Sequence, residues 1–203
     1  DAAVAEAYGL SVAVVPGSSD NVKITYQEDL DRASESLIIE SPDVRVGNGY
    51  DVHRFGKGEF VTICGVRIPH THTLEGHSDA DVGLHALTDA ILGAASKGDI
   101  GAYFPSNDDK WRDAPSQTFL KKAGEVVTAL NGTIQHLDIT IICEAPRITP
   151  YRQQMVTRIC EILSLNPARV NVKGKTTDKL GFVGRKEGIA AQATATIIIK
   201  PNA

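Results

Sequence analysis

Apolar and polar positions alternate over only short stretches before residue 40. The pattern predicts a short helix over residues 1–10, strands at 12–15 and 22–25, and a helix over Gln27–Ser36. These elements are too few to build a domain, and Pro42 would break a continuing helix. We therefore divide the chain into an N-terminal segment at 1–36, a linker at 37–43 and a domain at 44–203.

From residue 44 onward, strand-like stretches interleave with stretches of helical period. Strands are predicted at 44–52, 60–64, 66–69, 134–143, 169–173 and 188–199, and helices at 78–97, 116–130 and 150–163. Residues 70–76 and 98–109 are predicted to be loops. Interleaving of this kind is typical of an α/β or α+β domain, and we expect α+β, with helices covering one face of a single sheet.

The helix predicted at 78–97 combines a capping signal with an apolar stripe. Ser78 and Asp81 have the spacing of a capping box. Leu84, Leu87 and Ile91 recur on one face of the helix. His85 lies at the edge of that stripe, where an imidazole can be half-buried and still face a neighbouring strand.

The composition is that of an ordinary globular protein. The 203 residues are 42% hydrophobic and 23% charged, with a net charge of −4. This charge argues against a nucleic-acid or anionic membrane surface as partner. The longest apolar runs are well short of the roughly 20 residues that span a bilayer, and the three cysteines suit buried thiols. We expect a soluble, cytoplasmic protein.

The clearest candidate chemistry lies at Asp51, His53 and His85. Residues two apart on a strand point to the same side, so Asp51 and His53 can face one point. Two imidazoles and a carboxylate match a catalytic zinc site that keeps its fourth position open. The spacing alone leaves a purely structural Asp-His pair equally possible.

Two features next to His85 suggest supporting roles. Asp81 and Asp89 lie one turn either side of it, so either could accept the ring N–H that a metal-bound histidine donates. We favour Asp89 because Asp81 is needed as a cap. His77 and Ser78 precede the helix, where free N–H groups could bind an anion, unless Ser78 is only a cap.

Two further segments carry polar groups. Lys173–Asp178 contains cations, hydroxyls, a glycine and a carboxylate, a set suited to phosphate and a hard divalent ion, although a polar turn would have the same composition. It lacks the spacing of a Walker loop. Gly181–Arg185 sets Phe182 and Arg185 among glycines and is either a tight turn or the lip of a binding site.

Four motifs in order resemble the 2-C-methyl-D-erythritol 2,4-cyclodiphosphate synthase family. They are Gly47–His53, Gly76–Asp89, Gly98–Pro105 and Lys175–Phe182, and the resemblance covers 45–200. It implies a lyase of non-mevalonate isoprenoid biosynthesis, which converts 4-CDP-2-C-methyl-D-erythritol 2-phosphate to the cyclodiphosphate and releases CMP. It also implies zinc, a second ion that is Mg²⁺ or Mn²⁺, and a homotrimer with active sites at subunit interfaces.

The resemblance also implies residue roles. Zinc would be held by Asp51, His53 and His85, and the second ion by Asp178, where the family usually has Glu. His77 and Thr176 would stabilise the transition state. Phe182 and Arg185 match residues near the central cavity of the trimer, and the role of Lys175 stays open because small or hydroxyl residues also occur there. The implied substrate contacts are Asp51, Val52, His53, His77, Ser78, Asp99, Ile100, Gly101, Phe104, Pro105, Ser106, Asn107, Asp108, Cys143, Glu144, Ala145, Pro146, Arg147, Ile148, Thr149, Lys175, Thr176, Thr177, Asp178, Phe182 and Arg185.

The N-terminal segment has a resemblance of its own. Asp20–Thr25 and Glu28–Leu30 resemble the end of a 2-C-methyl-D-erythritol 4-phosphate cytidylyltransferase, in which Lys23 would contact methylerythritol phosphate. The Gly-rich nucleotide loop of that family is missing. We therefore expect a piece of a bifunctional fusion whose parent also makes CDP-methylerythritol from CTP and methylerythritol 4-phosphate.

Two other functions use the same residues. A zinc phosphohydrolase would use the three ligands to activate water. A ligand-binding or assembly module would use the metal structurally, which a fourth protein ligand would favour, and none is apparent in the sequence.

Overall fold

The computed structural model describes residues 2–13, 15–18, 21–37, 42–76, 78–105, 111 and 114–200. The chain divides into two compact units, Asp1–Ser41 and Pro42–Ala203. No helix among the described residues is long and apolar enough to cross a membrane.

The N-terminal unit contains the helices α1 (Ala2–Ala7) and α2 (Gln27–Leu37). The helix predicted at Gln27–Ser36 is confirmed, and Asp29 in its first turn accepts the N–H groups of Thr25 and Tyr26 at 3.0 Å each. The strands predicted at 12–15 and 22–25 are wrong, because the described residues of these segments form no strand. An isolated strand has no partner for its backbone hydrogen bonds, and two short ones cannot stand alone.

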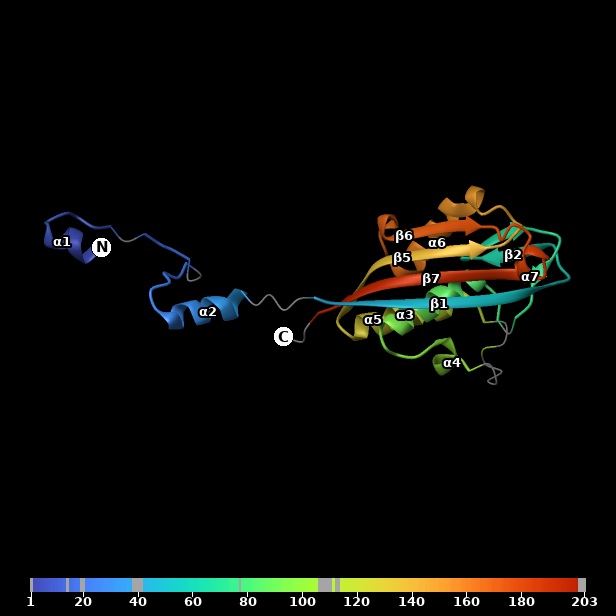
Figure 1. The fold of residues 1–203 in the computed structure, drawn as a ribbon, viewed down its shortest axis with the longest axis horizontal. Helices are drawn as coiled ribbons and strands as arrows, with labels where there is room; N and C mark the ends of the chain where they lie inside the picture. The colour runs from blue at the N-terminus through green and yellow to red at the C-terminus, as the bar shows by residue number, and fades with distance from the viewer. Residues whose placement is uncertain are drawn as a thin grey trace. The chain divides into compact units, whose positions relative to one another are not determined.

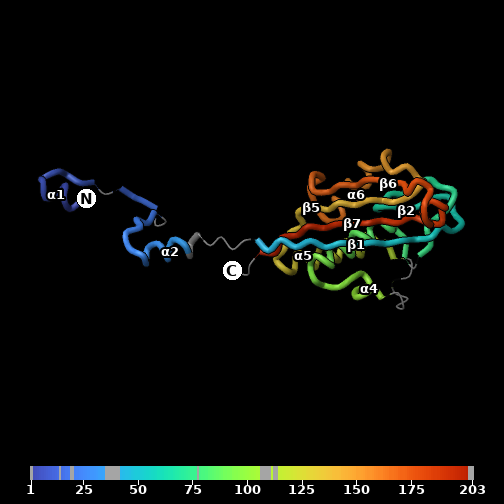
Figure 2. Tube along the Cα trace, in the orientation of Figure 1, coloured from blue at the N-terminus to red at the C-terminus, as the bar shows by residue number. Residues whose placement is uncertain are grey.

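The larger unit is built on one mixed sheet (Figures 1 and 2), as the interleaved pattern predicts. The strand order is β4-β1-β7-β5-β6, and every neighbouring pair is antiparallel except β5 and β6. The strands are β1 (Asp43–Gly56), β4 (Thr73–Leu74), β5 (Gly132–Ile142), β6 (Val170–Lys175) and β7 (Gly188–Ile199). A separate hairpin, β2 (Phe60–Ile63) with β3 (Val66–Pro69), turns at Gly65 as predicted.

Helices cover one face of this sheet. They are α3 (Val82–Ala94), α5 (Ser116–Ala129) and α6 (Arg152–Leu163), with the shorter α4 (Ile100–Tyr103) and α7 (Gly181–Gly184) in connecting segments. Helix α3 packs against β1 and β7, α5 packs beside it and against β5, and α6 packs against β6. Single 3₁₀ turns occur at Thr149–Tyr151 and Pro167–Arg169. The prediction of one helix-covered face is confirmed.

Two glycines bring α3 unusually close to β1. A Cβ atom on Gly47 would lie 2.2 Å from the carbonyl oxygen of Ala90, and one on Gly49 would lie 2.0 Å from that of Ala86. Only glycine permits this approach, and the facing alanines keep the helix side of the contact thin. The short side chain of Asp51, the next inward residue of β1, can therefore reach α3.

The other face of β1 carries apolar side chains. Val44, Val46, Tyr50 and Val52 are 55%, 59%, 57% and 39% exposed. They alternate with the inward-facing residues, as the two-residue period of a strand requires. A row of exposed apolar side chains on an open sheet face is typical of a surface that another protein covers.

The structure corrects three boundaries near the candidate site. Helix α3 is capped by Asp81, whose Oδ1 accepts the N–H groups of Gly83 and Leu84, so the prediction that Ser78 caps it is wrong. Residues 78–80 precede the helix, and Ala80 has a positive φ of 55° that interrupts any helical turn. The segments predicted to be loops at 70–76 and 98–109 contain the short elements β4 and α4.

Candidate metal centre

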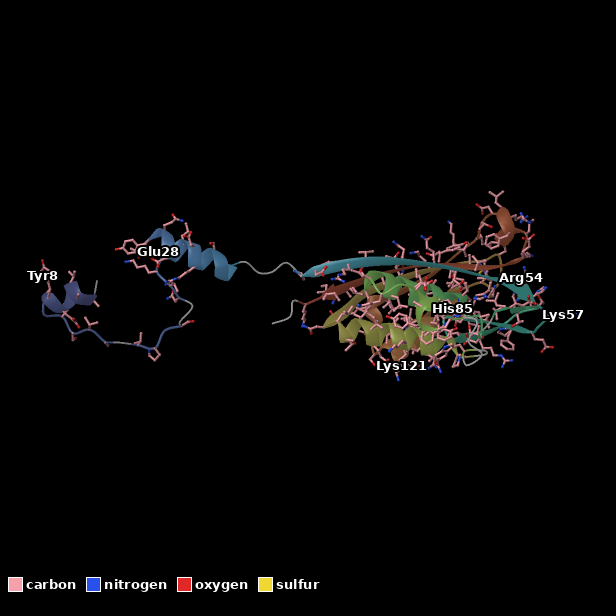
Figure 3. All side chains as sticks on the ribbon, turned by 90° about the horizontal axis from the view of Figure 1, so that it is seen from below. Tyr8, Glu28, Arg54, Lys57, His85 and Lys121 are labelled. Carbon is pink, nitrogen blue, oxygen red and sulfur yellow. The ribbon has the colours of Figure 1, made fainter. Side chains whose placement is uncertain are left out.

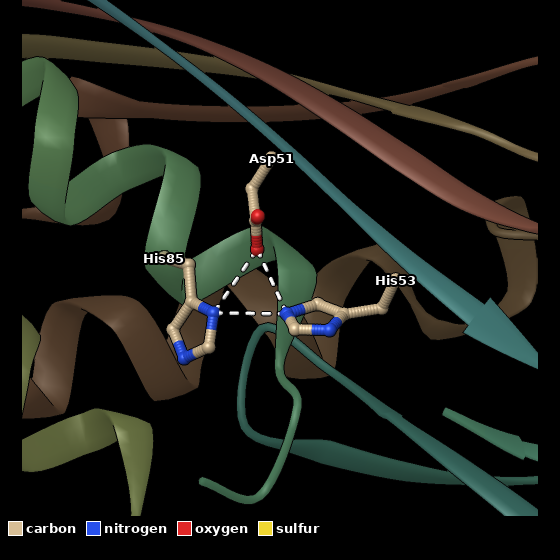
Figure 4. A group of neighbouring side chains, drawn as sticks. All are labelled: Asp51, His53 and His85. Carbon is tan, nitrogen blue, oxygen red and sulfur yellow. Dashed lines mark hydrogen bonds and ion pairs between the residues drawn. The ribbon is translucent and has the colours of Figure 1, made fainter. Parts of the chain in front are cut away.

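Strand β1 and helix α3 bring Asp51, His53 and His85 together (Figure 4). Asp51 Oδ2 lies 3.0 Å from both His53 Nε2 and His85 Nδ1, and the two ring nitrogens are 3.1 Å apart. The side chains are 26%, 14% and 12% exposed, respectively. Figure 3 shows His85 among the side chains of the helix layer. The predicted meeting of these three residues is confirmed.

A backbone carbonyl fixes the ring of His53. Its Nδ1 lies 2.8 Å from the carbonyl oxygen of Glu75, which immediately follows β4. A carbonyl only accepts hydrogen bonds, so Nδ1 carries a proton and donates it. A neutral ring then has its lone pair on Nε2, where it could ligate a metal ion bound beside Asp51 and His85.

The second nitrogen of His85 meets two hydroxyl groups. Its Nε2 lies 2.7 Å from Ser116 Oγ and 3.0 Å from Ser78 Oγ. The prediction that Asp89 accepts the ring N–H of His85 is therefore corrected. Asp89 Oδ1 instead accepts the N–H of Ile100 at 2.8 Å, because the polypeptide returns past α3 at the start of α4.

The three converging atoms fit a divalent transition metal. Two imidazole nitrogens and one carboxylate oxygen are donors that zinc prefers, and they number three, as in catalytic zinc sites. Ligand atoms around a tetrahedral zinc are about 3.3 Å apart for bonds of 2.0–2.1 Å. The 3.0–3.1 Å separations are close to that spacing. Only these three residues form such a group within the described ranges.

The charges around Asp51 support a bound cation. Burial by itself would raise the pKa of Asp51, but the hydrogen bonds that the His53 and His85 rings donate when protonated outweigh it and hold the pKa well below its usual range. Burial would lower the pKa of His53, and the Asp51 carboxylate more than offsets this and raises it. The centre thus keeps a negative charge on Asp51 and stabilises positive charge beside it.

A second group of predicted residues forms a separate groove of about 230 Å³. It is lined by Cys143, Glu144, Pro146, Arg147, Ile148, Thr149, Gly174, Lys175 and Thr176. The groove lies where β5 and β6 end side by side in parallel, as Ile142 pairs with Lys175. Residues of two predicted binding segments, far apart in sequence, therefore meet at one edge of the sheet.

Glu144 holds the segment that follows β6 in place through hydrogen bonds. Its Oε1 accepts the N–H of Thr177 at 3.0 Å and the hydroxyl of Thr177 at 3.2 Å. These contacts, the backbone N–H foremost, lower the pKa of Glu144. Asp178 and Lys179, in the turn after β6, both have positive φ, 51° and 67°. The exposed Asp178 is neither among the residues that line the groove nor in the triad.

The other predicted site residues are spread over loops. Asp99 caps α4, its Oδ1 accepting the N–H of Ala102 at 3.0 Å. Arg185 pairs with Glu187 at 2.8 Å and lies just after α7, which contains Phe182. Lys23 is exposed in the N-terminal unit. His77, Ser106, Asn107 and Asp108 lie outside the described residues.

Sequence reasoning missed an aromatic cluster beside the triad. The Phe104 ring lies 4.5 Å from that of Phe119 and 4.7 Å from that of Trp111, centroid to centroid. Phe119 lies 5.9 Å from His85. The family resemblance marks only Phe104, because the spacing of Phe119 in α5 is that of a core residue.

The fold and the centre define a class: a mixed α/β protein in which a helix-covered sheet presents an Asp-His-His candidate metal site. Residues 44–198 match the model of the YgbB family, and the chain belongs to that family. Residues 1–39 match the model described as 2-C-methyl-D-erythritol 4-phosphate cytidylyltransferase. Both resemblances drawn from the motifs are thereby confirmed.

Curated relatives of the whole chain are named as bifunctional enzymes. A bifunctional enzyme IspD/IspF from Chelativorans sp. is 54% identical to this chain over 200 residues. The match covers 97% of this chain and 49% of the relative. One from Rhodospirillum rubrum is 55% identical over 199 residues, covering 98% and 52%. The chain spans about half the length of these relatives.

Solved structures share the fold. The bifunctional IspDF from Campylobacter jejuni has a TM-score of 0.76 at 37% identity, covering 98% of this chain and 53% of that one. The CDP complex of IspF from Plasmodium falciparum has a TM-score of 0.69 at 34% identity, covering 78% and 97%.

Proposed function

We propose that the domain at 44–203 converts 4-CDP-2-C-methyl-D-erythritol 2-phosphate to 2-C-methyl-D-erythritol 2,4-cyclodiphosphate and releases CMP. The observation that carries this proposal is the convergence of Asp51 Oδ2, His53 Nε2 and His85 Nδ1 in a chain of this family. The names of the relatives, IspD/IspF, and the CDP bound to a structural relative support it.

The reaction needs charge neutralisation more than proton transfer. An oxygen of the 2-phosphate bonds to the β-phosphorus, the bond from that phosphorus to the oxygen bridging to the α-phosphorus breaks, and CMP leaves with that oxygen. A phosphate oxyanion is already a nucleophile, so a strong base is not needed. Bringing two anions together in line is the obstacle, and positioning is worth up to about 7–11 kcal/mol.

On this proposal, the triad supplies charge neutralisation and the groove positions the substrate. Asp51, His53 and His85 would hold zinc, which when bound supplies positive charge beside a phosphate oxygen. Ser78 can donate its hydroxyl hydrogen to that phosphate from its place beside His85. In the groove, Thr176 and Lys175 would contact the diphosphate, and Cys143–Thr149 would hold the cytidine. We assign His77 a role in the transition state from the family resemblance alone.

Asp178 is our candidate for the second ion, Mg²⁺ or Mn²⁺. Hard divalent cations prefer carboxylate oxygens, and Asp178 is exposed at the turn after the groove. We expect Asp178→Asn to lose the activation of turnover by Mg²⁺, by about tenfold or more, without changing the zinc content. Asp178→Glu, which keeps the charge, is the matched control and should retain the activation. Equal Mg²⁺ activation in the Asn variant would remove the assignment.

We further propose a homotrimer with active sites between subunits. The triad and the groove are lined by different residues of one chain, so a second copy could bring a groove to a triad. The exposed row of Val44, Val46 and Tyr50 on β1 offers an apolar surface for this contact.

The oligomeric state can be tested on that row. Native mass spectrometry should give the mass of three chains, and Val46→Asp should shift it toward one chain, because a charge would be buried against apolar partners. Val4→Asp, at a valine with a similar exposure of 60% in the N-terminal unit, should leave the trimer intact. A wild-type monomer at working concentrations would contradict the proposal.

The product of the reaction separates this function from its rivals. A zinc phosphohydrolase acting on the same substrate would yield an open-chain phosphate, whereas ring closure yields the cyclodiphosphate, and phosphorus NMR distinguishes them. A structural metal would have a fourth protein ligand, and the described residues supply three. The cytidylyltransferase activity belongs, on this proposal, to the longer parent protein, with 1–36 as its final segment and 37–43 as the linker. That the enzyme works in the cytoplasm stays a prediction from composition.

A further inference from the structure

A buried hydroxyl lies directly behind the metal centre. Ser116, the first residue of α5, is fully buried, and its Oγ lies 2.7 Å from His85 Nε2. Figure 4 shows this second ring nitrogen of His85 on the side away from Asp51. Ser116 therefore contacts a metal-binding residue without facing the metal position itself.

Asp79 holds Ser116 from two directions. The Ser116 hydroxyl donates to Asp79 Oδ1, and the Ser116 N–H donates to Oδ2 at 3.0 Å. Asp79 Oδ1 also accepts the N–H of Asp81 at 3.3 Å. Asp79 is the acceptor in all three contacts, so the hydrogen of the Ser116 hydroxyl points to Asp79.

The direction of this hydrogen bond determines the tautomer of His85. Because the Ser116 hydrogen is used on Asp79, its oxygen can only accept from Nε2 at 2.7 Å. Nε2 must then carry the proton, since two lone pairs facing each other at that distance would repel. A neutral ring with its proton on Nε2 has its lone pair on Nδ1, so Nδ1 can ligate a metal ion bound between it, Asp51 and His53.

Because Ser116 already accepts the ring N–H of His85, the hydroxyl hydrogen of Ser78 is available for another hydrogen bond. Its Oγ lies 3.0 Å from His85 Nε2 and can share the ring N–H as an acceptor. Its own hydrogen is not needed to fix the ring. The two serines therefore differ: Ser116 is tied to Asp79, and Ser78 can donate to an incoming oxyanion.

We propose that Asp79 and Ser116 act as a positioning relay, which holds His85 in the Nδ1-ligating tautomer and thereby sets the affinity of the centre for its metal. The inference rests on the proposed function only in taking the centre to bind a divalent metal. Ser116 is fully buried and contacts His85, and Asp79 is placed to act through Ser116. A ring partner of this kind is typically worth 10–100-fold in metal affinity.

The contacts of Ser116 allow the relay to be separated from simple anchoring of α5. Ser116→Ala removes the hydroxyl but keeps the backbone N–H that donates to Asp79 Oδ2. The matched control is Thr118→Ala, which removes an exposed hydroxyl from the same first turn of α5. Melting temperatures of both variants report any loss of the fold itself.

Metal binding is measured directly on the whole chain with zinc or cobalt alone. We expect chelator competition to give a 10–100-fold weaker zinc affinity for Ser116→Ala and an unchanged one for Thr118→Ala. The visible absorption of bound Co²⁺ should also change in Ser116→Ala, because the ring is no longer oriented. An unchanged affinity and spectrum in a folded Ser116→Ala protein would overturn the relay.

A double-variant comparison tests whether the two residues act as one unit. Asp79→Ala leaves the Ser116 hydrogen free to turn toward Nε2, so this variant should also bind zinc more weakly. Asp79→Ala combined with Ser116→Ala should lose little beyond Ser116→Ala alone. Fully additive losses would overturn the relay.

The metal measurements are independent of the reaction. If wild-type protein fails to form the cyclic product while the variants still lose zinc affinity, the proposed function fails and the relay stands. If the product forms and zinc affinity is unchanged, the relay fails and the function stands.

Discussion

Replacing His85 by alanine is expected to abolish ring closure. The substitution removes the only ligand that α3 contributes to the triad and leaves Asp51 and His53, both on β1. Two ligands hold a divalent ion far more weakly than three, and several kcal/mol of charge stabilisation is lost with it. We expect turnover to fall by about 10³-fold or more. Phosphorus NMR of the product and elemental analysis of bound metal are the measurements.

The same variant should still bind the CMP half of the substrate. The proposed cytidine contacts lie in the groove at the ends of β5 and β6 and do not include His85. Calorimetry with CMP should therefore give similar affinities for wild type and His85→Ala. His72→Ala, which removes an exposed imidazole outside the triad, serves as the control and should keep its metal and its activity. Normal turnover by metal-free His85→Ala would refute the assignment of the centre.

The triad could be proposed from the sequence because each of its residues has a local signal, although the fold brings His85 to Asp51 across 34 residues. Asp51 and His53 share a side of one strand, and the apolar stripe of α3 fixes which way His85 faces. The ring partners of His85 were not predictable in this way. Ser116 lies on another helix, 31 residues from His85, and no periodicity connects the two. Asp89 was chosen because helical spacing offers only local partners, and the fold supplied a distant one.

The elements of the sheet were predictable, but their order was not. Alternation identified β1, β5 and β7, although β1 runs four residues beyond the predicted end at Val52. Nothing in the pattern indicates that β7 lies between β1 and β5, or that β5 and β6 are parallel. That pairing depends on α6 crossing from one strand to the next. The parallel pairing of β5 with β6 determines which binding segments meet in the groove.

Gly49→Ala is expected to damage the fold and the metal centre together. The new Cβ would lie 2.0 Å from the carbonyl oxygen of Ala86 and 2.8 Å from the backbone nitrogen of Ala90. Backbone atoms cannot move aside as a side chain can, so α3 and β1 must separate. Overpacking of this kind costs about 1–3 kcal/mol or more, which corresponds to a melting temperature lower by roughly 2–12 °C.

The separation should also weaken zinc binding, because Asp51 and His85 come from the two elements that are forced apart. Gly93→Ala, on α3, the helix that faces Gly49, is the matched control. Its Cβ would lie 3.9 Å from the carbonyl oxygen of Asn48, an ordinary contact, and alanine favours a helix over glycine by about 1 kcal/mol. We therefore expect Gly93→Ala to melt at the wild-type temperature or higher and to keep its zinc affinity. If Gly49→Ala matched it in both measurements, the close approach of α3 to β1 would not be what positions the triad.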